Sequence, residues 1–294
     1  MSRVPRLPVA LGGGVHPDPG RRPYLGYRDG DADTDFGHFF RAELAPLADH
    51  VVAALSTGAV AAPLIRRAGD AGALLDDGYE HVETGYVLGG DGSMTVAART
   101  PMPGVTAEMW DWWFGWHGCD PRRYKLWHPR AHLWAAWDDG RGPGEDAGRR
   151  GRERYVGRTS YVDEYLGSVL MRASIRFVPP SELGIDEAPL ADGEQTVICA
   201  RVGSSDAPVD IGWLAHQVRP VDGGAEMRSR FWFGGPHIVA RTDIPGVRQA
   251  LPVAARRLVD TSDRAARELL VHCAQEMAHL ASFLPELHAE LGHT

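Results

Sequence analysis

Apolar residues recur at helical spacing near the C-terminus, over residues 262–280. Ser262 and Asp263 supply a start signal, and Pro285 supplies a stop. The positions on the apolar side of this helix are Leu269, Cys273, Met277 and Leu280. A polar group follows on its flank, made of His272, Glu276 and His279. The pattern predicts one long amphipathic helix whose polar flank faces the edge of a cavity.

Shorter runs with strand character precede this helix and are separated by clusters of Gly, Pro, Asp or Ser. They lie at 81–88, 94–100, 169–178, 196–202, 211–219 and 226–233. The first two are joined by the turn sequence of residues 89–93, which predicts a hairpin. Successive strands followed by a long helix favour an α+β fold, in which an antiparallel sheet grips the C-terminal helix around a cavity.

The N-terminal part has a different pattern. Residues 1–35 are rich in Pro, Gly and Asp and predict an extended arm. Helical spacing predicts helices over residues 36–55 and 62–75. We therefore expect a division into residues 1–78, an arm and helical region that could form a dimer contact, and residues 79–294, the main domain.

Two further segments stand out between the strands. Residues 106–117 predict a short aromatic helix that begins at Thr106 and stops at Gly118. Residues 138–154, dense in Gly and Arg, predict a solvated loop. Seven of the nine tryptophans lie between Trp110 and Trp137, and they could pack the core or wall an aromatic ligand.

The charge balance limits the partners. The formal net charge of -8 gives no basic face for nucleic acid or an anionic membrane. No apolar run is long enough to span a membrane and the first residues do not resemble a signal peptide, so a cytoplasmic protein is expected. The three cysteines are widely spaced and odd in number, which predicts reduced thiols.

His272 and Glu276 are one helical turn apart, so an imidazole and a carboxylate can converge on one cation. An exposed helix flank is the alternative for this pair. His128 and His132 in WHPRAH could also bind metal, or form a surface or hydrogen-bonded pair. Glu164 lies in a strand-like segment, but the register does not decide whether Glu164 or Asp163 points inward.

The motifs WWFGWH, YKLWHPRAH, YVDEYLG, AHQVR and HCAQE together resemble those of the zinc-dependent diacetylphloroglucinol hydrolases and the related phloretin hydrolases. This resemblance runs from about residue 80 to residue 284. It implies a Bet v 1-like main domain, dimerisation through the N-terminal helical region, and Zn²⁺. By motif match the zinc ligands would be His128, Glu164, His272 and Glu276. His132 and His279 would support them or substitute for one of them.

The resemblance further implies hydrolysis of the carbon–carbon bond between an acyl group and a phloroglucinol-type ring. Such a reaction needs a proton at the ring carbon, and His216 is the candidate donor. Tyr124, Tyr165 and Trp213 are the candidate substrate contacts. The family has a tyrosine near RSRFWFG, where Phe231 and Phe233 stand here.

Two other functions are compatible with parts of this pattern. A hydrophobic-ligand carrier could use the same fold, with its histidines and glutamates merely hydrogen-bonded. A non-haem iron oxygenase also uses two histidines and a carboxylate, although a fourth protein ligand would occupy a position that oxygen activation needs. Stoichiometric metal in the purified protein would separate the carrier from the enzymes.

Overall fold

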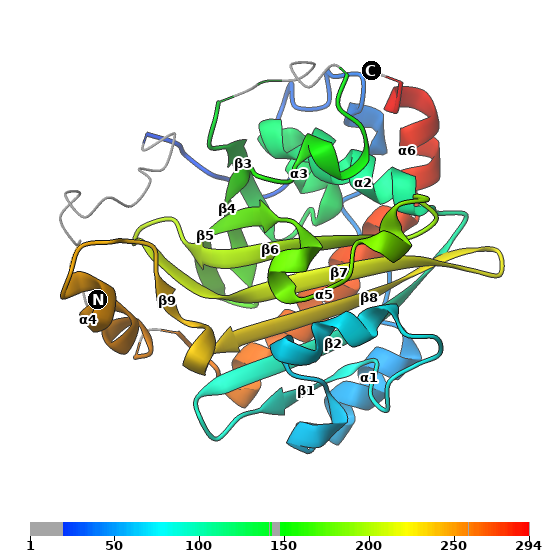
Figure 1. Ribbon diagram of the computed structural model, residues 1–294. Coiled ribbons are helices and arrows are strands. Elements are labelled where there is room, and N and C mark those ends of the chain that lie inside the picture. The colour runs from blue at the N-terminus through cyan, green and yellow to red at the C-terminus, as the bar shows by residue number, and fades with distance from the viewer. Residues whose placement is uncertain (1–19, 141, 143–147, 258, 294) are drawn as a thin grey trace.

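The computed structural model describes residues 20–140, 142, 148–257 and 259–293, and these contain one nine-stranded antiparallel sheet (Figure 1). The strand order is β1-β2-β8-β7-β6-β5-β4-β3, with β9 paired to β7. The strands are β1 (Gly85–Leu88), β2 (Ser93–Pro103), β3 (His132–Trp137), β4 (Thr159–Leu166), β5 (Val169–Val178), β6 (Thr196–Ser204), β7 (Val209–Val221), β8 (Gly224–Gly234) and β9 (Val239–Ala240).

The sheet packs against a long C-terminal helix, α5, which crosses behind β7 and β8 in Figure 1. The α-helices are α1 (Asp49–Thr57), α2 (Ala107–Trp116), α3 (Pro121–Trp127), α4 (Val247–Ala255), α5 (Asp263–Ala281) and α6 (Leu284–Leu291). This arrangement confirms the predicted α+β class, with an antiparallel sheet gripping the last long helix.

Helix α5 begins and ends where its sequence predicts. The hydroxyl of Ser262 accepts a hydrogen bond from the amide of Ala265 at 3.3 Å, which caps the first turn. The predicted apolar side is buried, since Cys273, Met277 and Leu280 are each 0% exposed. Burial of this stripe fixes the rotation of the helix, so that the flank with His272 and Glu276 turns toward β3 and β4.

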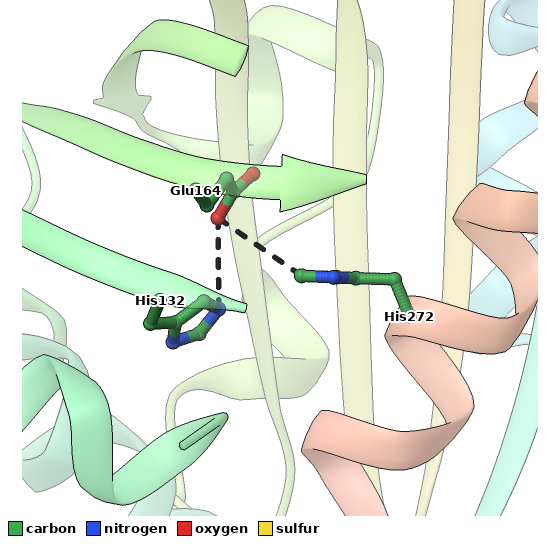
Figure 2. A group of neighbouring side chains, drawn as sticks. All are labelled: His132, Glu164 and His272. Atoms are coloured by element: carbon green, nitrogen blue, oxygen red, sulfur yellow. Dashed lines mark ion pairs between the residues drawn. The ribbon is translucent and has the colours of Figure 1, made fainter. Parts of the chain in front are cut away.

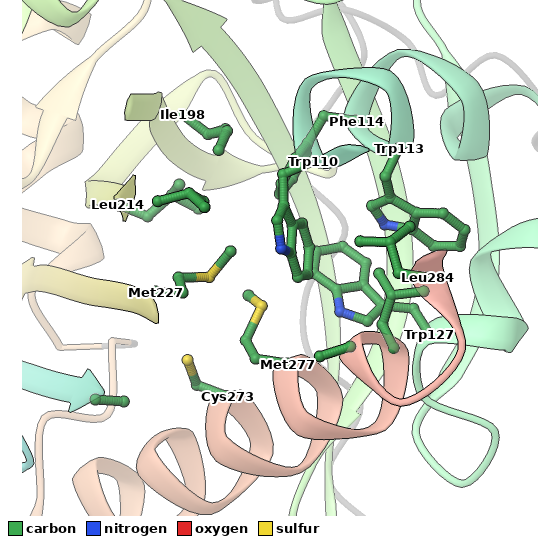
Figure 3. Packing of buried hydrophobic residues seen from close by; sticks show 14 of the residues in the cluster. Trp110, Trp113, Phe114, Trp127, Ile198, Leu214, Met227, Cys273, Met277 and Leu284 are labelled. Atoms are coloured by element: carbon green, nitrogen blue, oxygen red, sulfur yellow. The ribbon is translucent and has the colours of Figure 1, made fainter. Parts of the chain in front are cut away.

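The core between sheet and helix is dominated by aromatic rings from α2 and α3. Trp110, Trp113, Phe114 and Trp127 pack together above Met277 (Figure 3). The Thr106 hydroxyl accepts from the Met109 amide at 3.4 Å, which confirms the predicted aromatic helix and its cap. Most of the clustered tryptophans therefore serve the core.

The predicted helix over residues 36–55 is wrong in its first half. The chain forms one 3₁₀ turn at Gly37–Phe39 and then continues without regular secondary structure until α1 begins at Asp49. Pro46 lacks an amide proton and disfavours helical backbone at the residue before it, so the helix starts only beyond it. The second predicted piece consists of 3₁₀ turns at Ala62–Leu64 and Ala68–Leu75.

The 3₁₀ segment Ala68–Leu75 packs on the sheet face opposite to α5. Its Leu74 shares a hydrophobic cluster with Ala215 and Trp232. Arg228 also holds this 3₁₀ segment on the sheet, because it donates hydrogen bonds to the Leu74 carbonyl at 2.8 Å and to the Glu83 carboxylate at 2.7 and 3.0 Å. The division at residue 78 stays a prediction.

Parts of two expected segments lie outside the described residues. Of the predicted arm, these are residues 1–19, and of the predicted loop over 138–154, they are residues 141 and 143–147. Among the helices that the structure describes, none combines the length and the hydrophobicity needed to cross a membrane.

Candidate metal centre

Three side chains from three elements point at one another: His132 at the start of β3, Glu164 in β4 and His272 in α5 (Figure 2). Their nearest ligand atoms all lie within 4.8 Å of one another. The Glu164 carboxylate is 3.5 Å from Nε2 of His132 and 4.0 Å from Nε2 of His272. His132 and Glu164 are cross-strand partners in the β3–β4 register, so the sheet itself brings them together.

Glu276 adds a fourth ligand atom to this group. Its carboxylate lies 3.4 Å from Nε2 of His132 and 3.6 Å from Nε2 of His272. Zinc bonds of about 2.0–2.1 Å in a tetrahedral arrangement place neighbouring ligand atoms roughly 3.3–3.4 Å apart. Three of the four separations are close to that value. They are longer than good N–H···O hydrogen bonds, which favours ligands spaced around a common ion.

The tautomer of His132 also suits a ligand. Its Nδ1 lies 2.9 Å from the carbonyl of Tyr124, which requires a proton on Nδ1 and leaves a lone pair on Nε2. That Nε2 is buried and has no hydrogen-bond partner among the described residues. Such an orphaned atom, facing two carboxylates, fits a bound cation.

The charges of the four side chains also favour a bound cation. Burial, followed by the nearby His272 and His128, lowers the pKa of His132 well below its usual value, so this imidazole is neutral. Burial raises the pKa of Glu276, with a further contribution from Glu164. Burial alone would lower the pKa of His272, but the charge and hydrogen bond of Glu276, the charge of Glu164 and the backbone of Tyr165 together outweigh it and raise the value. With neutral imidazoles, two ionised carboxylates would leave two negative charges, which a divalent cation balances.

Tyr124 supports the group from α3. Its ring stacks on His132 with the ring centroids 3.7 Å apart, and its hydroxyl donates a short hydrogen bond to Glu164. Burial and the charge of Glu164 raise the pKa of Tyr124 well above 10.0, so its hydroxyl keeps the proton. Tyr124 thus orients two of the candidate ligands at once.

The structure places His132, and not His128, among the carboxylates, whereas the motif match predicts His128 as a ligand. The ring of His128 stacks on His272 at 4.8 Å, but no carboxylate of the described residues lies within ion-pair distance of it. Its Nδ1 is buried without a hydrogen-bond partner there, and burial lowers its pKa to about 3. His128 caps the end of α3, whereas His132 opens β3, so the four-residue interval separates their roles.

His279 lies apart from the carboxylates. Burial lowers its pKa to about 4, and its ring packs edge-on against Phe283 at 5.5 Å. The register of β4 resolves the other open choice: Glu164 points to the candidate centre, and Asp163 points to the opposite face, where Arg21 binds it.

The predicted proton donor lies on the face of the sheet that α5 covers. His216 is buried, and its Nδ1 is 2.8 Å from the hydroxyl of Ser229, its register partner in β8. The ring packs against Phe114 and Phe231, with centroids 6.2 and 5.5 Å away. Burial lowers the pKa of His216 to about 3. It therefore rests as a neutral imidazole among aromatic rings.

Two expected substrate contacts point elsewhere. Trp213 alternates with Leu214 along β7 and packs in the cluster on the opposite face, beneath Arg201 at 4.3 Å. Trp213 is therefore removed from the candidate contacts. Tyr165 follows Glu164 in β4, so strand alternation turns its side chain to the same face as Asp163, away from the centre. Only its backbone lies beside His272, where it helps to raise the pKa of that residue.

Sequence reasoning missed two features of the site, namely the contact between Tyr124 and Glu164 and the ion pair between Arg21 and Asp163. Each joins residues far apart in sequence: 40 positions for the first and 142 for the second. No spacing rule connects such positions. For the contact between Tyr124 and Glu164, the local sequence offers only the aromatic residues close to WHPRAH as a hint.

The chain is similar to a known protein family and to several known proteins. The family described as "DAPG hydrolase PhiG domain" matches residues 64–289. The 2,4-diacetylphloroglucinol hydrolase of Pseudomonas sp is 32% identical over 230 residues, which cover 76% of each chain. The phloretin hydrolase of Eubacterium ramulus is 29% identical over 276 residues, 90% of this chain and 93% of that protein. The crystal structure of Ara h 8.0201 covers 61% of this chain and 98% of its own, with a TM-score of 0.30 and 11% identity.

Proposed function

Because the chain belongs to the DAPG hydrolase family, we propose that it is a zinc-dependent hydrolase of acylated polyhydroxyphenols. Its relatives are named for 2,4-diacetylphloroglucinol and phloretin, which both carry an acyl group on such a ring. The proposed reaction adds water across the bond between the ring carbon and the acyl carbon. It yields a carboxylic acid, such as acetate, and the deacylated ring. The convergence of two histidines and two glutamates from β3, β4 and α5 carries this proposal.

The ligands that we propose for zinc are His132, Glu164, His272 and Glu276. When bound, the cation supplies Lewis acidity, which polarises a carbonyl or lowers the pKa of a water molecule. Tyr124 keeps Glu164 and His132 in place, through its hydroxyl and its ring. The oxygen of Tyr124 can still accept a hydrogen bond from a phenolic substrate, because only its proton is committed to Glu164.

When the bond to the acyl group breaks, the ring is the leaving group. An aryl carbanion is far too basic to leave, so the ring carbon must first be converted to a form that can carry the electron pair. A polyhydroxylated ring meets this need when one hydroxyl loses its proton and the acyl-bearing carbon gains one, which gives the keto tautomer. His216 suits both halves of this transfer. Its imidazole has a nitrogen that can accept the hydroxyl proton and return it to the ring carbon, and binding of a phenol in place of the aromatic packing would have to raise its lowered pKa for this transfer.

The surroundings of His216 support this role. Ser229 holds its Nδ1, which leaves Nε2 for the substrate. Phe114 and Phe231 on either side offer apolar surfaces for a flat ring. The absence of a hydroxyl at Phe231 and Phe233 removes one hydrogen-bonding possibility near the ring, so we expect a substrate range that differs from that of relatives with a tyrosine there.

Elemental analysis of the purified protein by mass spectrometry, paired with an ultraviolet assay for loss of the acylphenol, tests the proposal. Substrates would be diacetylphloroglucinol, monoacetylphloroglucinol and phloretin. We expect about one zinc per chain and turnover that a chelator abolishes and added zinc restores. Protein that binds an acylphenol unchanged and contains no metal would instead support a carrier.

A further inference from the structure

The described part of the N-terminal arm contacts the elements that carry the candidate zinc ligands. Arg21 forms a bidentate ion pair with Asp163, with Nε 2.6 Å from Oδ2 and Nη2 2.8 Å from Oδ1. Both side chains are shielded, with 9% exposure for Arg21 and 1% for Asp163. Two parallel charge-assisted hydrogen bonds of this kind fix orientation as well as adding energy. Arg21 lies before the first residue of the family match.

Asp163 is the residue before Glu164 in β4, and its cross-strand partner in β3 is Trp134. The guanidinium of Arg21 also lies over the Trp134 ring, 5.1 Å from its centroid. Arg21 therefore touches both strands of the β3–β4 pair, on the face opposite to the centre. Two residues before Trp134 on β3 is His132, which pairs with Glu164.

The arm also holds α3, through Tyr24 and Tyr27. The Tyr27 hydroxyl donates to the Arg122 carbonyl at 2.8 Å. The ring of Tyr24 lies 3.0 Å from Nζ of Lys125, which is 0% exposed and has no hydrogen-bond partner among the described residues. The residue before Lys125 is Tyr124, which contacts both Glu164 and His132.

We propose that Arg21 is a positioning residue for the zinc site, and that it acts through Asp163 on the paired ends of β3 and β4. This inference rests on the proposed zinc ligands. Without Arg21, Asp163 would be a shielded carboxylate with a lost partner, and relief of that charge requires the strand end to shift or to admit water. Glu164 is the next residue, so the shift reaches the candidate ligand directly. Loss of a residue that orients metal ligands typically weakens metal binding about 10- to 100-fold.

The test is a zinc titration of the full chain against a chromophoric chelator, for the parent and for three variants. Arg21→Ala removes the pair, Arg21→Lys keeps the charge without the bidentate geometry, and Arg22→Ala alters an exposed neighbour in the same arm. We expect zinc to bind about 10- to 100-fold more weakly to Arg21→Ala, less so to Arg21→Lys, and unchanged to Arg22→Ala.

The double variant Arg21→Ala/Asp163→Asn separates positioning from general stability. Removal of the unpaired charge should restore part of the zinc affinity that Arg21→Ala loses, whereas a merely structural role would not produce this recovery. Equal zinc affinity in the parent, Arg21→Ala and Arg21→Lys would overturn the inference, even if the melting temperatures differ. A parent that binds no zinc would overturn the zinc proposal itself, so the two failures are distinguishable. Should Arg21→Ala fail to fold, Arg21→Lys and Asp163→Asn carry the same comparison.

Discussion

His128 and His132 lie in one short motif, but their surroundings assign them different chemistry. His132 has an unpartnered Nε2 within 3.5 Å of two carboxylates, and His128 has no such neighbour among the described residues. The matched variants His132→Ala and His128→Ala should therefore differ. We expect His132→Ala to lose nearly all bound zinc and turnover, and His128→Ala to keep most of its zinc. Elemental analysis, with circular dichroism as the control for folding, measures this; the reverse result would return His128 to the ligand set.

His216 is predicted to act on the substrate and not on the metal. His216→Ala should keep about one zinc per chain, while turnover falls by about 10²–10⁴, the range typical of a lost acid–base group. His117→Ala is the matched control, because this histidine is also buried with a pKa lowered to about 4, and within the described residues its side chain hydrogen-bonds only the Trp113 carbonyl. Turnover that is equal in the parent and His216→Ala would remove His216 from the mechanism.

The residues of the centre could be predicted only in part from the sequence. The pair His272 and Glu276 was accessible because helical geometry fixes their separation. The choice between His128 and His132 depends on where α3 ends and β3 begins, which the turn after Pro129 decides. The misplacement of Trp213 has a similar cause, since strand alternation gives opposite faces to Trp213 and Leu214 and a segment's hydrophobicity does not say which is which.

At the scale of elements, Asp111 ties α2 to the rest of the core. Its Oδ1 accepts hydrogen bonds from Tyr155 at 2.6 Å and from Thr196 in β6 at 3.0 Å. Burial raises its pKa to about 6, above its ordinary value of 3.8. The folded state therefore holds this proton more tightly than the unfolded chain. The associated stability is fully present below pH 4 and is lost as the pH rises through 6.

Asp111→Asn should flatten this dependence. Between pH 5 and pH 8 the parent should lose on the order of 1–3 kcal/mol more unfolding free energy than the variant, since each pKa unit corresponds to about 1.4 kcal/mol. Urea unfolding of both proteins at the two pH values, in the presence of a chelator, measures the difference. The comparison cancels the titration of other groups, and equal slopes would show that Asp111 ionises in the folded protein as it does in the unfolded chain.

The elements themselves were predictable where local signals agreed. For α5, the cap, the apolar period and Pro285 all point to the same helix, and the hairpin of β1 and β2 combines alternation with a glycine-rich turn. The helix prediction for residues 36–48 failed because Phe39 and Phe40 follow helical spacing, although Pro46 prevents a continuous helical backbone. Phe36 and Phe39 are buried against the body, and this tertiary packing produced the misleading period.

At the scale of the whole molecule, the predicted homodimer can be tested through its expected contact region. Val52 on α1 is 47% exposed, an apolar side chain on the N-terminal part that was predicted to dimerise. Light scattering should give twice the chain mass of 32.0 kDa. Val52→Asp should shift the mass toward the monomer, whereas Val253→Asp, at a 60% exposed position on α4, should not. A parent of monomeric mass would contradict the dimer.

Metal removal should affect the entire fold, because the proposed ligands link two strands at the end of the sheet to the long helix. Binding to the folded state alone stabilises it by about 2.7 kcal/mol when free metal is a hundredfold above the dissociation constant. Without the cation, the charge of Glu164 also acts against ionisation of Glu276, and both carboxylates depend on the same His272 for a positive charge, which adds to the loss. A chelator should therefore lower the melting temperature of the parent and of His128→Ala but barely change that of His132→Ala. A similar decrease in His132→Ala would mean that the stabilising ion binds elsewhere, and that the cluster is held together by its own ion pairs.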